Sequence, residues 1–278
     1  MRTSPSAAEG AAWHPSAFIK GSVALHAAAA VVTLARPALW PWTVGAVLAD
    51  HLLISGAGLW PRSRLLGPNW THLPPQRAPS VALTIDDGPD PHVTPAVLRL
   101  LEAHAAQATF FCIGSRVAAH PALAREILAR GHSIENHSFR HSMAFSLAGP
   151  RAIAADVRRA QAVIAEVTGV APRFFRAPAG LRNPFLAPAL AHSGLTLVSW
   201  TRRGFDTVNT DPQHVLGRLT HRLAAGDILL LHDGHAARTP GGAPVILEVL
   251  PSLLTRCAAA GLRPVTLRAA FAAHAGAA

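Results

Sequence analysis

Two neighbouring carboxylates, Asp86 and Asp87, are the side chains in this sequence best placed to do chemistry. They follow residues 81–85, an apolar and β-branched run typical of a buried strand, and Gly88 and Pro89 end that run. Adjacent ionised carboxylates repel each other, so a cation or a shared proton is needed to offset the repulsion at a strand end. A solvated turn is the alternative, because Asp, Gly and Pro favour turns for local reasons.

A pair of histidines supplies further donors for a metal. His137 and His141 follow a predicted strand at residues 132–135, and their spacing predicts that both lie on one face of a helical turn. Two imidazoles and one carboxylate, for which Asp87 is the candidate, would make a three-ligand set with open positions for water. The chain has 16 histidines, so surface or core histidines are the alternative, and only the combination with the acidic pair favours a metal site.

Three more polar residues follow strand-like segments. Arg176 could hold a carboxylate in its ionised form and aim it. Asp206 could pair either with Arg176 or with a histidine. His232 comes directly after an apolar strand, an environment that can tune its proton affinity for work as a general acid. Taken singly, a solvated arginine and a satisfied core histidine are the ordinary explanations.

The elements that must position these residues alternate between strand and helix. We predict strands at residues 81–85, 108–113, 132–135, 173–176, 195–200, 227–231 and 264–267, and helices at residues 94–106, 121–129, 151–168, 183–192, 212–224 and 245–260. This repetition predicts an α/β fold with a parallel sheet, closed into a distorted (β/α) barrel of about seven strands. Chemistry in such barrels collects at the carboxyl ends of the strands, where the polar clusters fall.

Two apolar runs, residues 17–35 and 38–60, precede the barrel. Each is close to the ~20 residues that a helix needs to cross a bilayer, and tryptophans gather around their ends. Asp50 opposes insertion, at a cost of ~2.5 to 3.5 kcal/mol for a central acid. We nevertheless predict a membrane-anchoring helical hairpin, with membrane lipid as a partner, because no clear processing site follows the first run as it would in a cleaved signal peptide.

The predicted location is a bacterial-type inner membrane, and the basic residues that flank the hairpin favour the cytoplasmic side for the barrel. The predicted organisation is a tail at residues 1–16, the hairpin at 17–60, a proline-rich linker at 61–78, the barrel domain at 79–270 and a tail at 271–278. The net charge of +10 suits an anionic partner. The basic residues form no long run interleaved with aromatics, so nucleic acid is not predicted as a partner.

Residues 80–267 resemble the polysaccharide deacetylase family, the chitooligosaccharide deacetylase (NodB) homology domain of carbohydrate esterases. The resemblance rests on five ordered motifs, which are TIDDGP at 84–89, HSFRH at 137–141, RAPAG at 176–180, the Trp-to-Asp segment at 200–206 and LLLHD at 229–233. It implies a distorted seven-stranded (β/α) barrel that removes N- or O-acetyl groups from sugars with a divalent metal, commonly zinc. Acetylated carbohydrate is the implied substrate.

The resemblance also implies roles for the matching polar residues. Asp86 would be the general base, and Arg176 the group that orients it. His232 would be the general acid, with Asp206 as its supporting carboxylate. These roles make the protein a hydrolase of carbon–nitrogen bonds other than peptide bonds.

The remaining motif residues would bind the metal and the substrate. Asp87, His137 and His141 match the metal ligands, most readily for Zn²⁺, with Co²⁺, Ni²⁺ or Mn²⁺ as other possibilities. Ala179, through its backbone N–H, and Leu230 would face the substrate and the developing oxyanion.

Two positions depart from the family pattern and leave the substrate open. Arg203 stands where the fourth motif usually has Asp, and Ala179 where the third usually has an aromatic residue. Neither change removes a metal ligand, but both reshape the predicted substrate subsites. A deformylase or deacetylase of a lipid-linked amino sugar is therefore a second hypothesis. A catalytically silent sugar-binding relative is a third, disfavoured because every proposed ligand, the base and the acid are present.

Overall fold

Strand β1 (Ser80–Asp86) lies at the centre of the sheet, and all of its residues are buried. The structure is a computed structural model and describes residues 13–75 and 78–275. β1 pairs in parallel with β2 (Thr109–Cys112) on one side and with β7 (Ile228–His232) on the other. An apolar run of this kind fits a parallel strand that is covered on both faces.

The strands follow the order β5-β4-β3-β2-β1-β7-β6, and β8 pairs with the start of β1. The other strands are β3 (Ser133–Asn136), β4 (Phe174–Phe175), β5 (Thr196–Leu197), β6 (Arg202–Arg203) and β8 (Arg263–Val265). Strands β5 and β6 end this order, yet they belong to one extended segment. Within it the Val198 N–H donates to Phe175 O, and the Thr201 N–H donates to Ile228 O. This segment joins the two edges, and the predicted distorted (β/α) barrel is confirmed.

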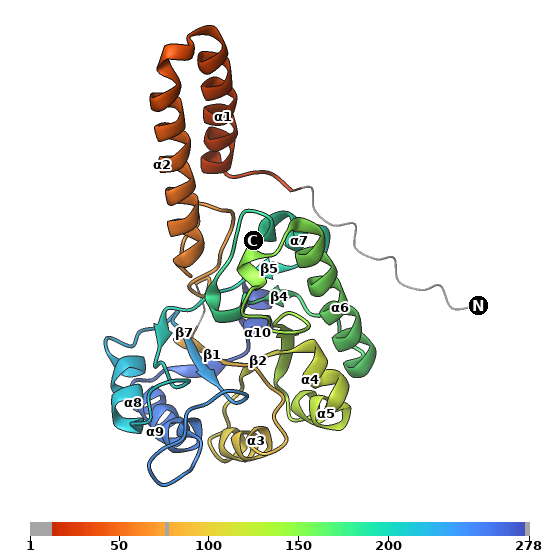
Figure 1. Ribbon diagram of the computed structural model, residues 1–278. Coiled ribbons are helices and arrows are strands. Elements are labelled where there is room, and N and C mark those ends of the chain that lie inside the picture. The colour runs from red at the N-terminus through yellow and green to blue at the C-terminus, as the bar shows by residue number, and fades with distance from the viewer. Residues whose placement is uncertain (1–12, 76–77, 276–278) are drawn as a thin grey trace, which may run out of the picture.

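Helices follow the strands and cover the outside of the sheet (Figure 1). They are α3 (Thr94–Ala103), α4 (Gly114–Ala119), α5 (Pro121–Ala129), α6 (Pro150–Thr168), α7 (Leu186–His192), α8 (Pro212–Thr220), α9 (Val245–Ala259) and α10 (Leu267–Ala275), with short 3-10 turns η1 (Pro37–Leu39), η2 (Phe145–Leu147) and η3 (Pro178–Gly180). Helix α6 stops at Gly169, whose φ of 72° is a left-handed conformation that glycine adopts without a steric cost.

Alternation along β1 and β7 decides which side chains reach the barrel interior. Leu229 and Leu231 belong to the core cluster that includes residues of α3 and α9, whereas Leu230 belongs to the cluster that includes Phe111 and Trp200. Successive side chains of a strand point to opposite faces, so His232 shares the inner face with Leu230. The same alternation along β1 places Asp86 on the inner face. Each fully buried leucine contributes about 1.5–3 kcal/mol to this arrangement.

Helices α1 (Ala17–Ala35) and α2 (Trp40–Leu59) form an apolar hairpin that projects from the barrel (Figure 1). Ser22 donates a hydrogen bond of 2.6 Å to Asp50 across the hairpin, which gives this buried acid a partner between the two helices. Large apolar side chains face outward, including Leu34 and Leu52, which are 84% and 74% exposed. By length and composition both helices can cross a membrane, which fits a membrane anchor and also a signal sequence.

The proline-rich segment after the hairpin packs against the barrel over residues 61–75. Leu66 and Leu73 are buried there, and Trp70 forms a parallel bridge with Val198 in the segment that joins β5 to β6. The Arg182 N–H donates to Gly58 O, which ties the end of α2 to the loop after η3. The end of the hairpin therefore lies against the barrel.

Candidate active site

A cavity of about 500 Å³ opens at the carboxyl ends of the strands. Most of the residues predicted from the sequence line it, namely Asp86, Asp87, His137, His141, Ala179, Leu230 and His232. Arg176 and Asp206 are buried next to it, and each binds a side chain that lines it. Residues that are distant in the sequence thus meet at one end of the barrel, as the strand-end argument predicts.

The two adjacent carboxylates face the same cavity because the strand ends between them. Asp86 is the last residue of β1, whereas Asp87 has a φ of 76° and leaves the strand direction. A regular strand would send neighbouring side chains to opposite faces. The positive φ is uncommon for a residue other than glycine, and here it brings a second carboxylate to the inner side of the sheet.

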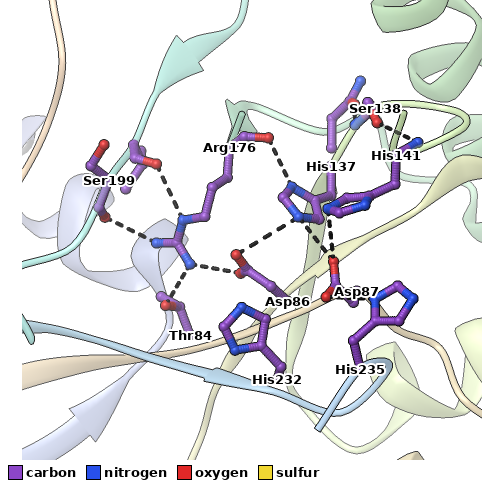
Figure 2. A network of polar contacts seen from close by, with 12 residues as sticks. Thr84, Asp86, Asp87, His137, Ser138, His141, Arg176, Ser199, His232 and His235 are labelled. Atoms are coloured by element: carbon purple, nitrogen blue, oxygen red, sulfur yellow. Dashed lines mark hydrogen bonds and ion pairs between the residues drawn. The ribbon is translucent and has the colours of Figure 1, made fainter. Parts of the chain in front are cut away.

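Three donor atoms converge at the centre of the site (Figure 2). The Oδ1 atom of Asp87 lies 3.2 Å from Nε2 of His137 and 3.1 Å from Nε2 of His141. All three atoms lie within 4.8 Å of one another. Asp87 Oδ1 is buried and has no hydrogen-bond partner in the part of the chain that the structure describes.

The hydrogen bond at Nδ1 of His137 shows that Nε2 of His137 and Oδ1 of Asp87 suit a cation. Its Nδ1 lies 2.8 Å from the carbonyl oxygen of Arg176, so Nδ1 carries a proton and donates it. In the neutral imidazole, Nε2 then presents a lone pair to a carboxylate oxygen. Two facing lone-pair donors are stabilised by a cation between them or by an extra proton. One carboxylate and two imidazoles are ordinary ligands of a divalent metal such as zinc.

The pKa values of these donors follow from their contacts. Burial opposes the charged form of His137, yet the neighbouring carboxylates of Asp86 and Asp87 raise its pKa above the ordinary value. Burial would raise the pKa of Asp87, but the neighbouring imidazoles of His137 and His235 hold it well below the usual range. Burial, together with the nearby His137, lowers the pKa of His141 to about 4, which favours its neutral form as a ligand.

The predicted helical turn between the two histidines is wrong. Residues 137–141 form a loop in which Ser138 and His141 have φ values of 64° and 49°. The Ser138 side chain accepts a hydrogen bond from the His141 N–H at 2.9 Å, and Asp156 accepts one from the Phe139 N–H at 2.8 Å. The imidazoles converge because α6 and the loop's own side chains hold this irregular backbone.

Asp86 is fixed by an arginine whose three guanidinium nitrogens are all hydrogen-bonded. Arg176 donates from Nη1 to Asp86 Oδ1 and to Thr84 Oγ1, both at 2.7 Å. Its Nε and Nη2 donate to the carbonyl oxygens of Val198 and Ser199, in the segment that joins the barrel edges. The other carboxylate oxygen of Asp86 lies 3.8 Å from Nε2 of His137. Arg176 therefore sets the direction of Asp86 and leaves one oxygen facing the candidate metal centre.

His232 lies next to Asp86 on the neighbouring strand, in the register that pairs the two residues. Asp206 accepts two hydrogen bonds from it, at 2.9 Å from the ring Nδ1 and at 2.7 Å from the backbone N–H. Of the two partners predicted for Asp206, a histidine is therefore the one observed. Burial disfavours the imidazolium, but the charge of Asp206 and its hydrogen bond raise the pKa of His232 above the ordinary value.

The sequence reasoning missed His235, which contacts the candidate metal centre. Its Nδ1 donates to Asp87 Oδ2 at 2.8 Å, on the side of the carboxylate away from His137 and His141. Arg116 lies on the other side of the ring, 3.3 Å from Nε2. His235 follows the end of β7 by three residues. Because polar residues that follow barrel strands gather at the active site, its position in the loop after β7 was the signal that could have identified it.

We predict that His235→Ala weakens metal binding by about 10–100-fold, the usual effect of losing a hydrogen bond that orients a ligand. The side chain is 50% exposed, so the change should not unfold the barrel. His235→Asn retains a donor and should restore part of the affinity. The measurement is metal affinity by chelator competition, with the exposed His104→Ala as a control. Unchanged metal affinity in His235→Ala would show that the hydrogen bond from His235 does not help Asp87 to bind the metal.

Comparisons with known proteins agree on one family. A sequence profile described as polysaccharide deacetylase matches residues 74–198. A peptidoglycan-N-acetylglucosamine deacetylase of Bacillus cereus is 34% identical over 181 residues, which cover 64% of this chain and 84% of that protein. A chitooligosaccharide deacetylase of Bradyrhizobium is 36% identical over 157 residues, covering 56% of this chain and 71% of that protein.

A solved structure of a carbohydrate esterase shares the fold of this chain. A family 4 carbohydrate esterase from Streptomyces lividans, in complex with acetate, superposes with a TM-score of 0.61 and 30% identity, over 68% of this chain and 92% of that chain. The fold and the site define a barrel hydrolase with an Asp-His-His candidate metal centre. More specifically, the chain belongs to the polysaccharide deacetylase family.

Proposed function

We propose that this protein hydrolyses the N-acetyl or O-acetyl group of a carbohydrate with the help of a divalent metal. One observation carries the proposal. Donor atoms of Asp87, His137 and His141 converge within 4.8 Å, in a cavity that Asp86 and His232 also line. The relatives named above, which act on peptidoglycan N-acetylglucosamine or chitooligosaccharides, support an acetylated amino sugar as the substrate.

The metal ligands are Asp87, His137 and His141. A divalent metal bound there would polarise the acyl carbonyl and would lower the pKa of a bound water to about 7. We propose Zn²⁺ as the native ion, because imidazole and carboxylate ligands with open positions are typical of catalytic zinc. Co²⁺, Ni²⁺ and Mn²⁺ suit the same donors.

Asp86 is the general base. Arg176 binds its Oδ1 at 2.7 Å, so Oδ2 faces the candidate metal centre and can take the proton of the attacking water. Negative charge then develops on the acyl oxygen. The backbone N–H of Ala179 stabilises it as an oxyanion donor, in a turn where Ala179 itself has a φ of 54°.

His232 is the general acid, on the other side of Asp86 from the metal ligands. Its Nδ1 is bonded to Asp206, so Nε2 is the atom that gives a proton to the leaving amine. An amine leaves poorly unless it is protonated, which makes the raised pKa of His232 useful. Leu230, two residues earlier on the same inner face, supplies an apolar surface for the acyl methyl group.

The test uses purified full-length protein in detergent with Zn²⁺ and N-acetylated chitotetraose or peptidoglycan fragments. Release of acetate together with an equal amount of free amine is expected. Sugar binding without acetate release, in protein with stoichiometric metal, would instead support the catalytically silent relative. The complete set of base, acid and donor atoms argues against that alternative.

We also propose that the α1–α2 hairpin anchors the protein in a bacterial-type inner membrane, with membrane lipid as its partner. The exposed apolar side chains and the buried Ser22–Asp50 hydrogen bond support two spans. In this organisation residues 17–60 form the hairpin, residues 61–78 connect it and residues 79–270 form the catalytic domain. A lipid-linked amino sugar is then available as substrate to a domain held at the bilayer.

The flanking basic residues predict that the catalytic domain is cytoplasmic. Green fluorescent protein fused after residue 65 should fluoresce, whereas alkaline phosphatase fused at the same place should be inactive. The reverse pattern would place the domain outside the inner membrane. It would also favour a peptidoglycan substrate over one made in the cytoplasm.

A further inference from the structure

A second and larger cavity, of about 860 Å³, lies beside the catalytic one. It is bounded by the residues after α2, by β6 and by α8. Basic side chains dominate its lining, and we call it the basic cavity; they are Arg62, Arg202, Arg203, His214, Arg218 and His221. None of the residues that line it is acidic.

Most of this positive charge has no partner in the protein. Arg202 is neutralised by Asp227, with Nε 2.9 Å from the carboxylate. By contrast, the structure shows no hydrogen bond or ion pair from the side chains of Arg62, Arg203 or Arg218 to any described residue, and the Nε of Arg203 is buried without a hydrogen-bond partner. A buried N–H without an acceptor costs free energy, which an anion in the cavity would recover.

Two of these guanidinium groups are held close to one aromatic ring. Arg203 lies 4.8 Å and Arg218 lies 4.7 Å from the ring centroid of Phe205. The ring favours each cation, but like charges gathered in this way repel unless an anion compensates them. Arginine forks match phosphate oxygens in two-point contacts, so phosphate is the anion that this arrangement suits best.

The basic cavity adjoins both the catalytic cavity and the hairpin. Trp200 and Arg203 line both cavities, so the two cavities adjoin at these side chains. Trp60 and Arg62 directly follow α2, at the end of the hairpin that lies against the barrel. A sugar in the catalytic cavity could therefore place an attached phosphate among the arginines, near the proposed membrane surface.

We propose that the basic cavity binds the phosphate of the substrate, and that the substrate is an N-acylated amino sugar that carries a phosphate or diphosphate. Arg62, Arg203 and Arg218 are its ligands. This inference rests on the proposed deacetylase function and names the substrate class for that site. The phosphate can belong to a lipid-linked sugar or to a soluble sugar phosphate, and the experiment separates these sources.

The test compares three N-acetylglucosamine substrates with full-length protein in vesicles of a zwitterionic lipid. They are the neutral methyl glycoside, the 1-phosphate and a farnesyl diphosphate derivative inserted in the vesicle. Free amine is measured for each, with neutral chitotetraose as the reference for basal activity. Preference for both phosphorylated sugars over the methyl glycoside is expected, and a further preference for the farnesyl derivative identifies the lipid-linked source.

The variant is Arg62→Gln with Arg218→Gln, two exposed side chains outside the catalytic machinery. It should lower kcat/KM for the phosphorylated sugars by about 100-fold, because two charged contacts are lost and each is worth roughly a factor of ten. Activity on chitotetraose should stay unchanged. The matched control is Arg158→Gln with Arg151→Gln, which removes two exposed arginines from α6, on another side of the barrel (Figure 1).

A binding measurement separates this inference from the proposed function. Calorimetry with N-acetylglucosamine 1-phosphate and with inorganic pyrophosphate should show binding that the double variant loses, whether or not the sugar is hydrolysed. If chitotetraose is not deacetylated but this binding is observed, the proposed function fails and the phosphate site stands. If chitotetraose is deacetylated with no preference for phosphorylated sugars and no such binding, the inference is overturned. It is also overturned if the double variant loses only its binding to vesicles of anionic phospholipid, since the cavity would then hold a lipid headgroup.

Discussion

Asp86→Asn is expected to lower the turnover of an N-acetylated sugar by about 10²–10⁴-fold, the contribution of a well-placed general base. Asparagine has nearly the same shape, but its amide cannot take the proton of water. The Oδ1 atom of asparagine can still accept the hydrogen bond that Arg176 donates at 2.7 Å, so the side chain keeps its direction. Bound metal should remain close to stoichiometric, because the three converging donors belong to Asp87, His137 and His141.

The measurements are acetate release and metal content of the purified variant. Thermal unfolding should show some loss of stability, because Arg176 is buried and Asp86 is the acidic side chain it pairs with. Glu166→Gln is the matched control, since it removes an exposed acid on α6. Full turnover in Asp86→Asn would remove this residue from the mechanism, and loss of the metal would reassign it as a ligand.

The sequence predicted the strand framework well because its central strands are apolar runs bounded by turn residues. β1 and β7 were expected at residues 81–85 and 227–231, and the structure places them at Ser80–Asp86 and Ile228–His232. Parallel strands with a period of two put Asp86 and His232 at the same end and on the same face. Local pattern and barrel geometry together were therefore sufficient to place the proposed base and the proposed acid.

Elements without an apolar pattern were missed. β6 consists of Arg202 and Arg203, which carry no strand signal of their own and are placed by pairing with Leu229 and Leu230 of β7. The short helix α4 (Gly114–Ala119) was also not predicted, because it has only six residues and no full amphipathic period.

The loop conformations at the candidate site were also not predicted from the sequence. Left-handed conformations at Ser138 and His141 replace the expected helical turn, and they depend on contacts with residues far along the chain, such as Asp156. The contact of His235 with Asp87 depends on two loops meeting. The spacing of residues within a motif carries no information about such contacts, which arise only from the tertiary fold.

His137→Ala is expected to abolish metal binding, and with it nearly all turnover. His137 is 2% exposed and is held by the carbonyl oxygen of Arg176, so its Nε2 has a fixed position at the candidate metal centre. The two remaining donors, Asp87 and His141, fall below the three protein ligands of a catalytic metal site. The measurement is metal content after dialysis against a trace of chelator, with His104→Ala as control; stoichiometric metal in His137→Ala would refute the proposed centre.

The wild-type protein provides a second test of the same centre through pH. The carboxylates of Asp86 and Asp87 raise the pKa of His137, so a metal must displace a proton from this imidazole before it can bind. Below the raised pKa the imidazolium competes with the metal, and above it the neutral ligand is ready. Metal affinity should therefore increase as the pH rises through this pKa, with release of a proton on binding below it. Calorimetric titration in buffers of different ionisation enthalpy measures that proton, and an affinity independent of pH across this range would mean that His137 is not a ligand.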